Sequence, residues 1–213
     1  MLNVDFHCHT CYSKDSLTTL ESLLEACQQK GIDRLVITDH NTIAGRTRAR
    51  ELDSQRFIVG EEIMTSAGEL LAVYVQEEVP GRLPPMQAIQ RLREQGAFIS
   101  VSHPFDRMRS GGWRLPDLLQ ILPLIDAIET FNARCLWQGF NRNAQAFARQ
   151  HGLPGTVGSD AHTLSELGQA TLSLPEFDDP ASLREAIRQG QPHLRPSGFW
   201  VHFFSRYARM KKK

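Results

Sequence analysis

Short apolar, β-branched runs alternate with amphipathic segments along the chain. Runs of the first kind are typical of buried strands, and apolar residues spaced three and four apart are typical of helices. The expected strands are 2–6, 34–38, 57–60, 97–101, 126–130, 156–157 and 170–174, with 69–75 as an added strand. The expected helices are 18–30, 42–52, 86–95, 115–122, 137–151 and 181–189. Thr18 and Glu21 have the spacing of a capping box at the start of the first helix.

The repeated strand–helix order predicts an α/β protein with a parallel sheet, closed or nearly closed into a barrel, and helices outside it. An open doubly wound sheet is the alternative, but that fold favours a glycine-rich phosphate loop after the first strand. This chain has His7-Cys8-His9 there instead. With 213 residues and no visible linker or repeat, we expect a single domain over 1–213, with an aromatic and basic segment at about 196–213.

Composition narrows the classes of function. Lys plus Arg and Asp plus Glu both total 24, so the net charge of zero indicates no general attraction to nucleic acid. No apolar run approaches the roughly 20 residues that span a bilayer, and the N-terminal residues lack the pattern of a signal peptide. The four cysteines lack the spacing of a disulfide framework. These features predict a reduced, cytoplasmic protein without a transmembrane segment.

Five short motifs with histidine or carboxylate side chains each follow an apolar strand run. They are 5–10 (DFHCHT), 38–40 (TDH), 60–62 (GEE), 102–104 (SHP) and 158–162 (GSDAH). Imidazole and carboxylate bind divalent metals such as zinc, manganese and iron. In a strand–helix barrel, the C-terminal ends of the strands share one face, where active sites lie. The pattern therefore predicts a site for more than one metal, of the kind that activates water and binds phosphate.

Each motif alone also has a simpler explanation. His7 and His9 are two residues apart and point to the same side of a strand, but solvent-facing pairs have the same spacing. An adjacent pair of glutamates is common in solvated turns. Cys8 and Cys11 form a C-x-x-C, but haem attachment needs a histidine where Tyr12 stands, so we expect Cys8 to be a small buried residue. The ordered occurrence of the motifs after five strands favours the metal site.

The ordered series DFHCHT, TDHN, SHP and GSDAH resembles the PHP family, the "polymerase and histidinol phosphatase" domain of metal-dependent phosphoesterases. The likeness extends over about 2–190 and includes 129–134 (ETFNAR). It implies a distorted (β/α)7 barrel with two or three divalent ions, Mn, Fe or Zn, and an active site at the C-terminal ends of the strands. The implied metal ligands are His7, His9, Asp15, His40, Glu62, Glu69, His103, Asp160 and His162.

The resemblance also implies how these ligands divide among the metals. The residues for the first metal are His7, His9, Glu62 and Asp160. Those for the second are His103 and Glu62, which bridges the first two metals. Those for the third are Asp15, His40 and His162. Glu69 stands where many members have a histidine ligand of the second metal, so it is either a carboxylate ligand or a surface residue.

The implied reaction is hydrolysis of a small phosphorylated metabolite or nucleotide by a metal-activated water, with Asp160 or His162 as proton carrier. Three arginines are candidates for phosphate binding, because the guanidinium fork matches phosphate oxygens. Two lie on a loop after a ligand strand, and the third follows the next strand. They are Arg107, Arg109 and Arg134, of which the last two are favoured. Each could also be a surface residue or belong to a structural salt bridge.

Two alternative functions stay open at this stage. One is an exonuclease that acts on oligonucleotide ends, although the stretch from His103 to Asp160 is short for a nucleic-acid insertion. The other is a non-catalytic metal-binding docking module, for which lost ligands would be the sign.

The segment 196–213 is expected to form a helix that packs its aromatic side chains on the barrel, with a solvated lysine tail. Contact with a nucleic-acid backbone, an acidic membrane or a partner subunit is the alternative. His151, His193 and His202 fit no ligand motif and are expected to be structural or surface residues.

Overall fold

The computed structural model describes residues 1–212 and is built on a nine-stranded sheet. The strands are β1 (Leu2–Cys8), β2 (Arg34–Ile37), β3 (Phe57–Met64), β4 (Glu69–Val73), β5 (Phe98–Val101), β6 (Ala127–Asn132), β7 (Gly155–Gly158), β8 (Ala170–Leu174) and β9 (Gln191–Leu194). The helices are α1 (Leu20–Lys30), α2 (Arg46–Asp53), α3 (Pro85–Glu94), α4 (Leu115–Ile121), α5 (Gln138–His151), α6 (Pro180–Ala186) and α7 (Val201–Lys211), with 3-10 turns at Leu122–Leu124 and Ile187–Gln189.

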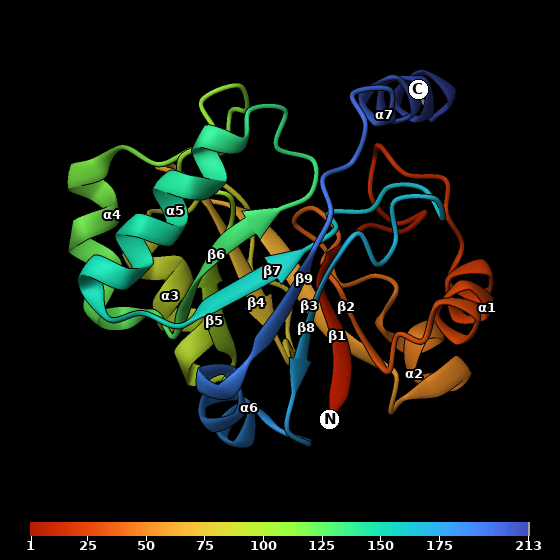
Figure 1. Ribbon diagram of the computed structural model, residues 1–213, viewed down its shortest axis with the longest axis horizontal. Helices are drawn as coiled ribbons and strands as arrows, with labels where there is room; N and C mark the ends of the chain where they lie inside the picture. Colours follow the sequence, from red (N-terminus) through yellow and green to blue (C-terminus); the bar gives the residue numbers. More distant parts are fainter. Residues whose placement is uncertain (213) are drawn as a thin grey trace.

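The sheet curls into a nearly closed barrel with helices around it (Figure 1). Its strand order is β7-β6-β5-β4-β3-β2-β1-β8-β9, so β7 and β1 are not neighbours in the hydrogen-bonded order. They nevertheless lie against each other, because a Cβ on Gly158 would come within 2.3 Å of the Cβ of His7. Glycine is required at this contact. The expected α/β barrel of the PHP type is confirmed.

The expectation of a parallel sheet is wrong at two strands, β4 and β8. β4 pairs antiparallel with both β3 and β5, and β8 pairs antiparallel with β1 and β9. Only residues 65–68 separate β3 from β4, whereas a crossover between parallel neighbours needs about a dozen residues or more. The reversal brings the start of β4 to the same edge as the C-terminal end of β3.

Several expected boundaries shift for identifiable reasons. Thr19, and not Thr18, caps α1 by accepting a hydrogen bond from the backbone N–H of Ser22. The hydroxyl of Thr18 instead donates to the carbonyl of His162 at 2.9 Å, which ties the start of α1 to the loop after β7. β3 continues to Met64, so the glutamates after Gly60 lie in a buried strand and not in a solvated turn.

The core lies on both faces of the sheet. One cluster of buried residues includes Phe6, Val36 and Phe98 from three different strands. Another packs α1 against β1 and β2 and includes Cys8 and Cys27. All four cysteines are free, and Cys8 is fully buried as expected. No helix within residues 1–212 has the length and apolar character needed to cross a membrane.

The C-terminal segment forms the expected helix, α7, but its aromatic side chains do not pack on the barrel. The side chains that α7 buries are the small ones of Ser205 and Ala208. The aromatic residues of α7 that are more than half exposed are Phe203, Phe204 and Tyr207. The physical reason is that α7 lies over a polar region, where Ser205 accepts a hydrogen bond from Arg134 at 2.8 Å. Lys213 of the expected lysine tail lies outside the described residues.

Candidate metal centre

All nine candidate ligands gather at one end of the barrel. His7 lies next to the end of β1, Glu62 lies near the end of β3, and Glu69 opens β4, which runs in the opposite direction. The other six lie on loops that follow β1, β2, β5 and β7. Eight of the nine are more than nine-tenths buried, and the side chain of His40 is 19% exposed. Ionisable groups at such density in a protein interior need charge compensation.

His7 and His9 present their Nε2 atoms to one point, with the two nitrogens 3.1 Å apart. Glu62 oxygens lie 3.3 Å from Nε2 of His7 and 3.4 Å from Nε2 of His9. Asp160 Oδ1 lies 3.6 and 3.3 Å from the same two atoms. Ligand atoms around a tetrahedral zinc, each about 2.0–2.1 Å from the metal, are about 3.3–3.4 Å apart. This four-residue cluster therefore has the donor atoms and the spacing of a metal site.

His103 and Glu69 extend the cluster on one side. Nε2 of His103 lies 3.1 Å from Oε1 of Glu62 and 3.4 Å from Oε2 of Glu69. Glu69 is only 6% exposed, so it is not a surface residue. A Cβ on Gly111 would approach Oε2 of Glu69 to 1.7 Å, and the glycine therefore leaves the space that the carboxylate occupies.

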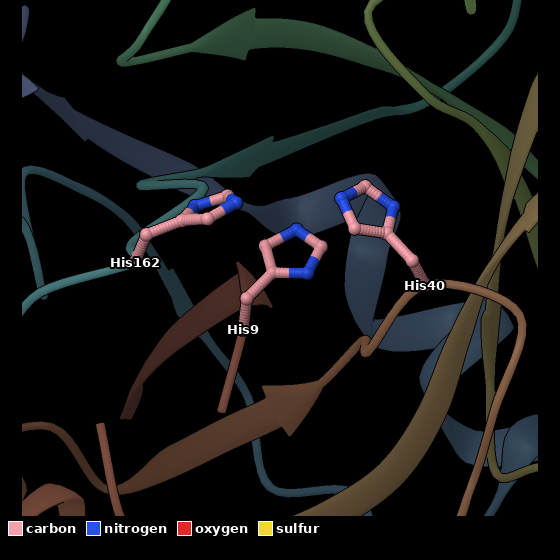
Figure 2. Close-up of side chains that lie close together, drawn as sticks. All are labelled: His9, His40 and His162. Carbon is pink, nitrogen blue, oxygen red and sulfur yellow. The ribbon is translucent and has the colours of Figure 1, made fainter. Parts of the chain in front are cut away.

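Asp15, His40 and His162 extend the cluster on the other side. Asp15 lies 3.4 Å from Nε2 of His40 through Oδ2 and 3.4 Å from Nε2 of His162 through Oδ1. The rings of His40 and His162 flank His9, and one nitrogen of each of the three rings lies within 4.8 Å of the others (Figure 2). His40 also reaches Glu62, with Nδ1 2.9 Å from Oε2. The three groups of ligands are thus contiguous.

The electrostatics of the cluster indicate a need for positive charge. Burial acts to lower the pKa of His7, but Asp160 and Glu62 raise it well above its usual value. Burial acts to raise the pKa of Glu62, but His7 and His40 lower it well below its usual range. Metal binding requires neutral imidazole and ionised carboxylate. A divalent ion would supply the charge that these carboxylates otherwise draw from protonated histidines.

Unpaired atoms and backbone conformation support the same assignment. Oδ1 of Asp15 and Nδ1 of His103 are buried without a hydrogen-bond partner in residues 1–212. Asp160 has a φ of 52° and His103 a φ of 20°, in a region that residues other than glycine rarely adopt. Backbone strain of this kind is typical of functional sites.

The sequence did not single out Glu129, which supports two of the ligands. Its Oε1 lies 2.9 Å from Nδ1 of His7, and its Oε2 accepts the backbone N–H of His103 at 2.7 Å. Asn132 donates to Glu129 at 3.2 Å and to Asp160 at 3.1 Å. Carboxylates bonded to the far nitrogen of a histidine ligand orient the ring and raise its basicity. The available signal was a glutamate in the buried strand β6.

The three candidate arginines have different positions. Arg109 bonds to Asp160 and lies 3.3 Å from Asp106, at the edge of the cluster. Arg134 is 5% exposed and is engaged by Glu166 at 3.0 Å, by Ser205 and by His162. Arg107 is exposed and lies apart from the cluster, in a separate depression lined by Phe105 and Trp113. The structure therefore favours Arg109 over Arg107 as the arginine that serves this site.

A cavity of about 500 Å³ opens over the cluster, and α7 forms one of its walls. The α7 residues in that wall are His202, Ser205, Arg206 and Arg209. His202, expected to be a structural or surface residue, is thus part of the mouth of the cavity. Arg209 binds Asp15, with Nη2 2.7 Å from Oδ2, and Nζ of Lys212 donates to the carbonyl of Cys11 at 2.6 Å. The spacing of these polar residues on one helix face was the signal in the sequence.

Comparisons with known proteins identify the family of this chain. The family model described as "PHP domain" matches residues 5–80, and the one described as "PHP-associated" matches residues 138–192. The uncharacterized protein MJ0417 of Methanocaldococcus jannaschii is 34% identical over 180 residues, which are 83% of this chain and 72% of that protein. The chain therefore belongs to the PHP family, which comprises metal-dependent phosphoesterases.

Two further similarities concern activity and fold. A phosphoribosyl 1,2-cyclic phosphate 1,2-diphosphodiesterase of Eggerthella lenta is 48% identical over 48 residues, 22% of this chain and 18% of that protein. A two-domain protein from Bacteroides vulgatus, which contains a predicted PHP-like metal-dependent phosphoesterase, superposes with a TM-score of 0.72 and 20% identity. The superposition covers 91% of this chain and 65% of that one, and it shows likeness of fold.

Proposed function

We propose that this protein hydrolyses a phosphate ester of a small metabolite or nucleotide at the nine-residue cluster, with divalent metals bound. The observation that carries the proposal is the convergence of the His7 and His9 Nε2 atoms on oxygens of Glu62 and Asp160, at 3.3–3.6 Å. Bound divalent ions in such a site neutralise phosphate charge and activate water. The donor set suits Mn, Fe or Zn.

The residues around the cluster have separable roles in this proposal. Glu62 lies close to His7 on one side and to His103 on the other. This position suits a carboxylate shared between two ions. Arg109 lies at the rim, where it is half-buried and paired with Asp160 and Asp106. We assign it to phosphate binding, in which a substrate phosphate replaces part of these contacts. Arg134 is held by its neighbours, and we assign it the orientation of His162 in place of direct phosphate binding.

His162 is suited to act as a metal ligand. Burial, His9 and Arg134 lower its pKa to about 3. The imidazole is therefore neutral near pH 7, which is the form that binds a metal. So low a pKa makes it a weak base toward the reacting water, so the role of ligand is favoured over that of proton carrier.

The dimensions of the cavity favour a small substrate. Its volume of about 500 Å³ lies within the range of roughly 300–1,000 Å³ that is typical of small-molecule sites. Arg109 borders it on one side and α7 on the other, so the anionic end of a substrate meets cationic groups at the rim. The partial similarity to a diphosphodiesterase supports the inclusion of phosphodiesters among the substrates tested.

A hydrolysis screen with added Mn²⁺ tests the proposal. It should include phosphomonoesters, cyclic nucleotides, nucleoside bisphosphates and short oligonucleotides. We expect turnover of a small ester, and we expect chelation of the metal to abolish it. Asp160→Asn should reduce this turnover by about a thousandfold or more, and Arg107→Ala should leave it unchanged. Equal activity in wild type and Asp160→Asn would contradict the proposal. Preference for the interior of long oligonucleotides would refute the small substrate.

A further inference from the structure

The face of α7 that points away from the barrel is aromatic. Six apolar side chains on α7 and the two residues before it are more than half exposed: Phe199, Trp200, Phe203, Phe204, Tyr207 and Met210. A surface helix ordinarily turns its apolar face to the core and its polar face to water. In α7 the large apolar side chains are exposed instead, and the buried positions hold the small residues Ser205 and Ala208. Neither family model extends to these residues, because the second ends at residue 192.

Charge is distributed unevenly between this segment and the rest of the chain. Residues 186–213 contain seven Lys or Arg and no Asp or Glu. The chain as a whole has no net charge, so residues 1–185 are net negative. Within the helix, Arg206 and Lys211 flank the aromatic face. An anionic surface complements a segment that combines exposed aromatics with excess positive charge.

The packing of the rings distinguishes among possible anionic partners. The rings of Phe199 and Trp200 are 4.2 Å apart, and those of Trp200 and Phe203 are 5.7 Å apart. These three rings are tilted by 33° and 36° to one another and form one cluster, whereas single-strand binders present separate ring faces on which successive bases stack. A contact between the α7 helices of two copies would bring like charges together, because this helix has no acidic residue. A cluster of rings with basic flanks instead matches an interfacial membrane helix.

We propose that α7 docks the protein on the surface of an anionic lipid bilayer. The aromatic face lies among the headgroups, and Arg206 and Lys211 lie near the lipid phosphates. The helix does not span the bilayer, since it is 11 residues long. Because the same helix lines the cavity through His202 and Arg209, docking places the mouth of the site beside the bilayer surface. Docking itself does not depend on the proposed phosphoesterase activity.

Vesicle co-sedimentation of the full chain tests the proposal with a matched pair of variants. Trp200 and Trp137 are exposed to 64% and 66%, but Trp200 directly precedes α7 whereas Trp137 directly precedes α5. We expect binding to phosphatidylcholine vesicles with about 30% phosphatidylglycerol that weakens as salt screens the charges. Trp200→Ser should weaken it by about tenfold or more, because it removes one of the largest inserted apolar surfaces, and Trp137→Ser should not. Circular dichroism and metal content should stay unchanged in both variants.

Three outcomes would overturn the proposal. The first is no binding to anionic vesicles at low salt, and the second is equal loss of binding in Trp200→Ser and Trp137→Ser. The third is that Trp200→Ser selectively dissociates a dimer or abolishes binding to a single-stranded oligonucleotide while vesicle binding is absent. Tyr207→Ser, which changes the opposite end of the same face, should reproduce the loss seen with Trp200→Ser.

Discussion

Arg209 of α7 binds Asp15 directly, with Nη2 2.7 Å from Oδ2, although 194 positions separate the two residues. Asp15 is also the carboxylate that His40 and His162 approach to 3.4 Å. The guanidinium therefore contacts the same carboxylate that would hold a metal in this group. The C-terminal helix and the metal centre are coupled through one carboxylate.

Removal of this contact should strengthen metal binding at Asp15. We expect Arg209→Gln to bind Mn²⁺ about tenfold more tightly in the weakest site, because a competing positive charge near the ion is lost. Isothermal titration calorimetry of the metal-free protein measures the affinity. Arg206→Gln is the matched control, since Arg206 lines the same cavity without contacting Asp15. Unchanged or weaker binding in Arg209→Gln would show that the contact does not compete with metal.

Glu129 should matter for metal affinity although it is not a proposed ligand. Its carboxylate holds Nδ1 of His7 at 2.9 Å. Glu129→Gln should lower metal affinity by about 10–100-fold, the usual effect of losing such a partner. Competition with a fluorescent chelator measures it, with the exposed Glu176→Gln as control. If affinity is unchanged while the fold is intact, Glu129 has only a structural role.

Gly111 should control whether Glu69 can serve the site. An alanine Cβ at this position would lie 1.7 Å from Oε2 of Glu69 and would displace the carboxylate. We expect Gly111→Ala to lose one bound ion or about tenfold in its affinity. Gly198→Ala is the control, because a Cβ there meets nothing within 4 Å. Full metal content in Gly111→Ala, measured by mass spectrometry, would mean that Glu69 is not a ligand.

Glu61 should make stability depend on pH. Burial raises its pKa to about 8, although the N–H of Val79 donates to it, and its second oxygen has no partner in residues 1–212. The folded state therefore holds a proton that the unfolded state, with a pKa near 4.5, releases. This contribution is fully present below pH 4.5 and is lost as pH rises toward 8.

The substitution Glu61→Gln should remove that dependence. Relative to wild type, its free energy of unfolding should increase by a few kcal/mol between about pH 5 and pH 8. Urea denaturation at several pH values measures the difference. A difference that is constant over this range would contradict the raised pKa of Glu61.

The sequence predicted the strands and helices that have strong local patterns. The strand expected at 170–174 has those bounds as β8, and the helix expected at 137–151 begins one residue later as α5. β9 was not predicted because its four residues are exposed and give no apolar run. The antiparallel directions of β4 and β8 depend on pairing between distant segments, which local pattern does not contain.

The candidate ligands were recognisable because each follows a strand in a short motif. Their supporting residues were not, since Glu129 looks like any other glutamate until β6 is placed beside β5 and β7. Arg134 was expected to meet phosphate, but Glu166 lies within 3.0 Å of it after folding. For α7 the expected packing of the aromatic side chains on the barrel was wrong, because the sequence alone does not show which side of a helix packs against the rest of the protein.

The central claim, that the nine-residue cluster binds divalent metals, is tested most directly by the metal content of His9→Asn. His9 belongs to two sets of side chains whose donor atoms lie within 4.8 Å of one another, so one substitution affects both sets. The two sets are His9 with His40 and His162, and His9 with His7 and Glu62. Chelator-treated wild type and His9→Asn should be equilibrated with Mn²⁺, dialysed and analysed by mass spectrometry. We predict more than one ion per chain in wild type and a loss of at least one in His9→Asn. Equal metal content in the two proteins, or none in wild type, would contradict the account.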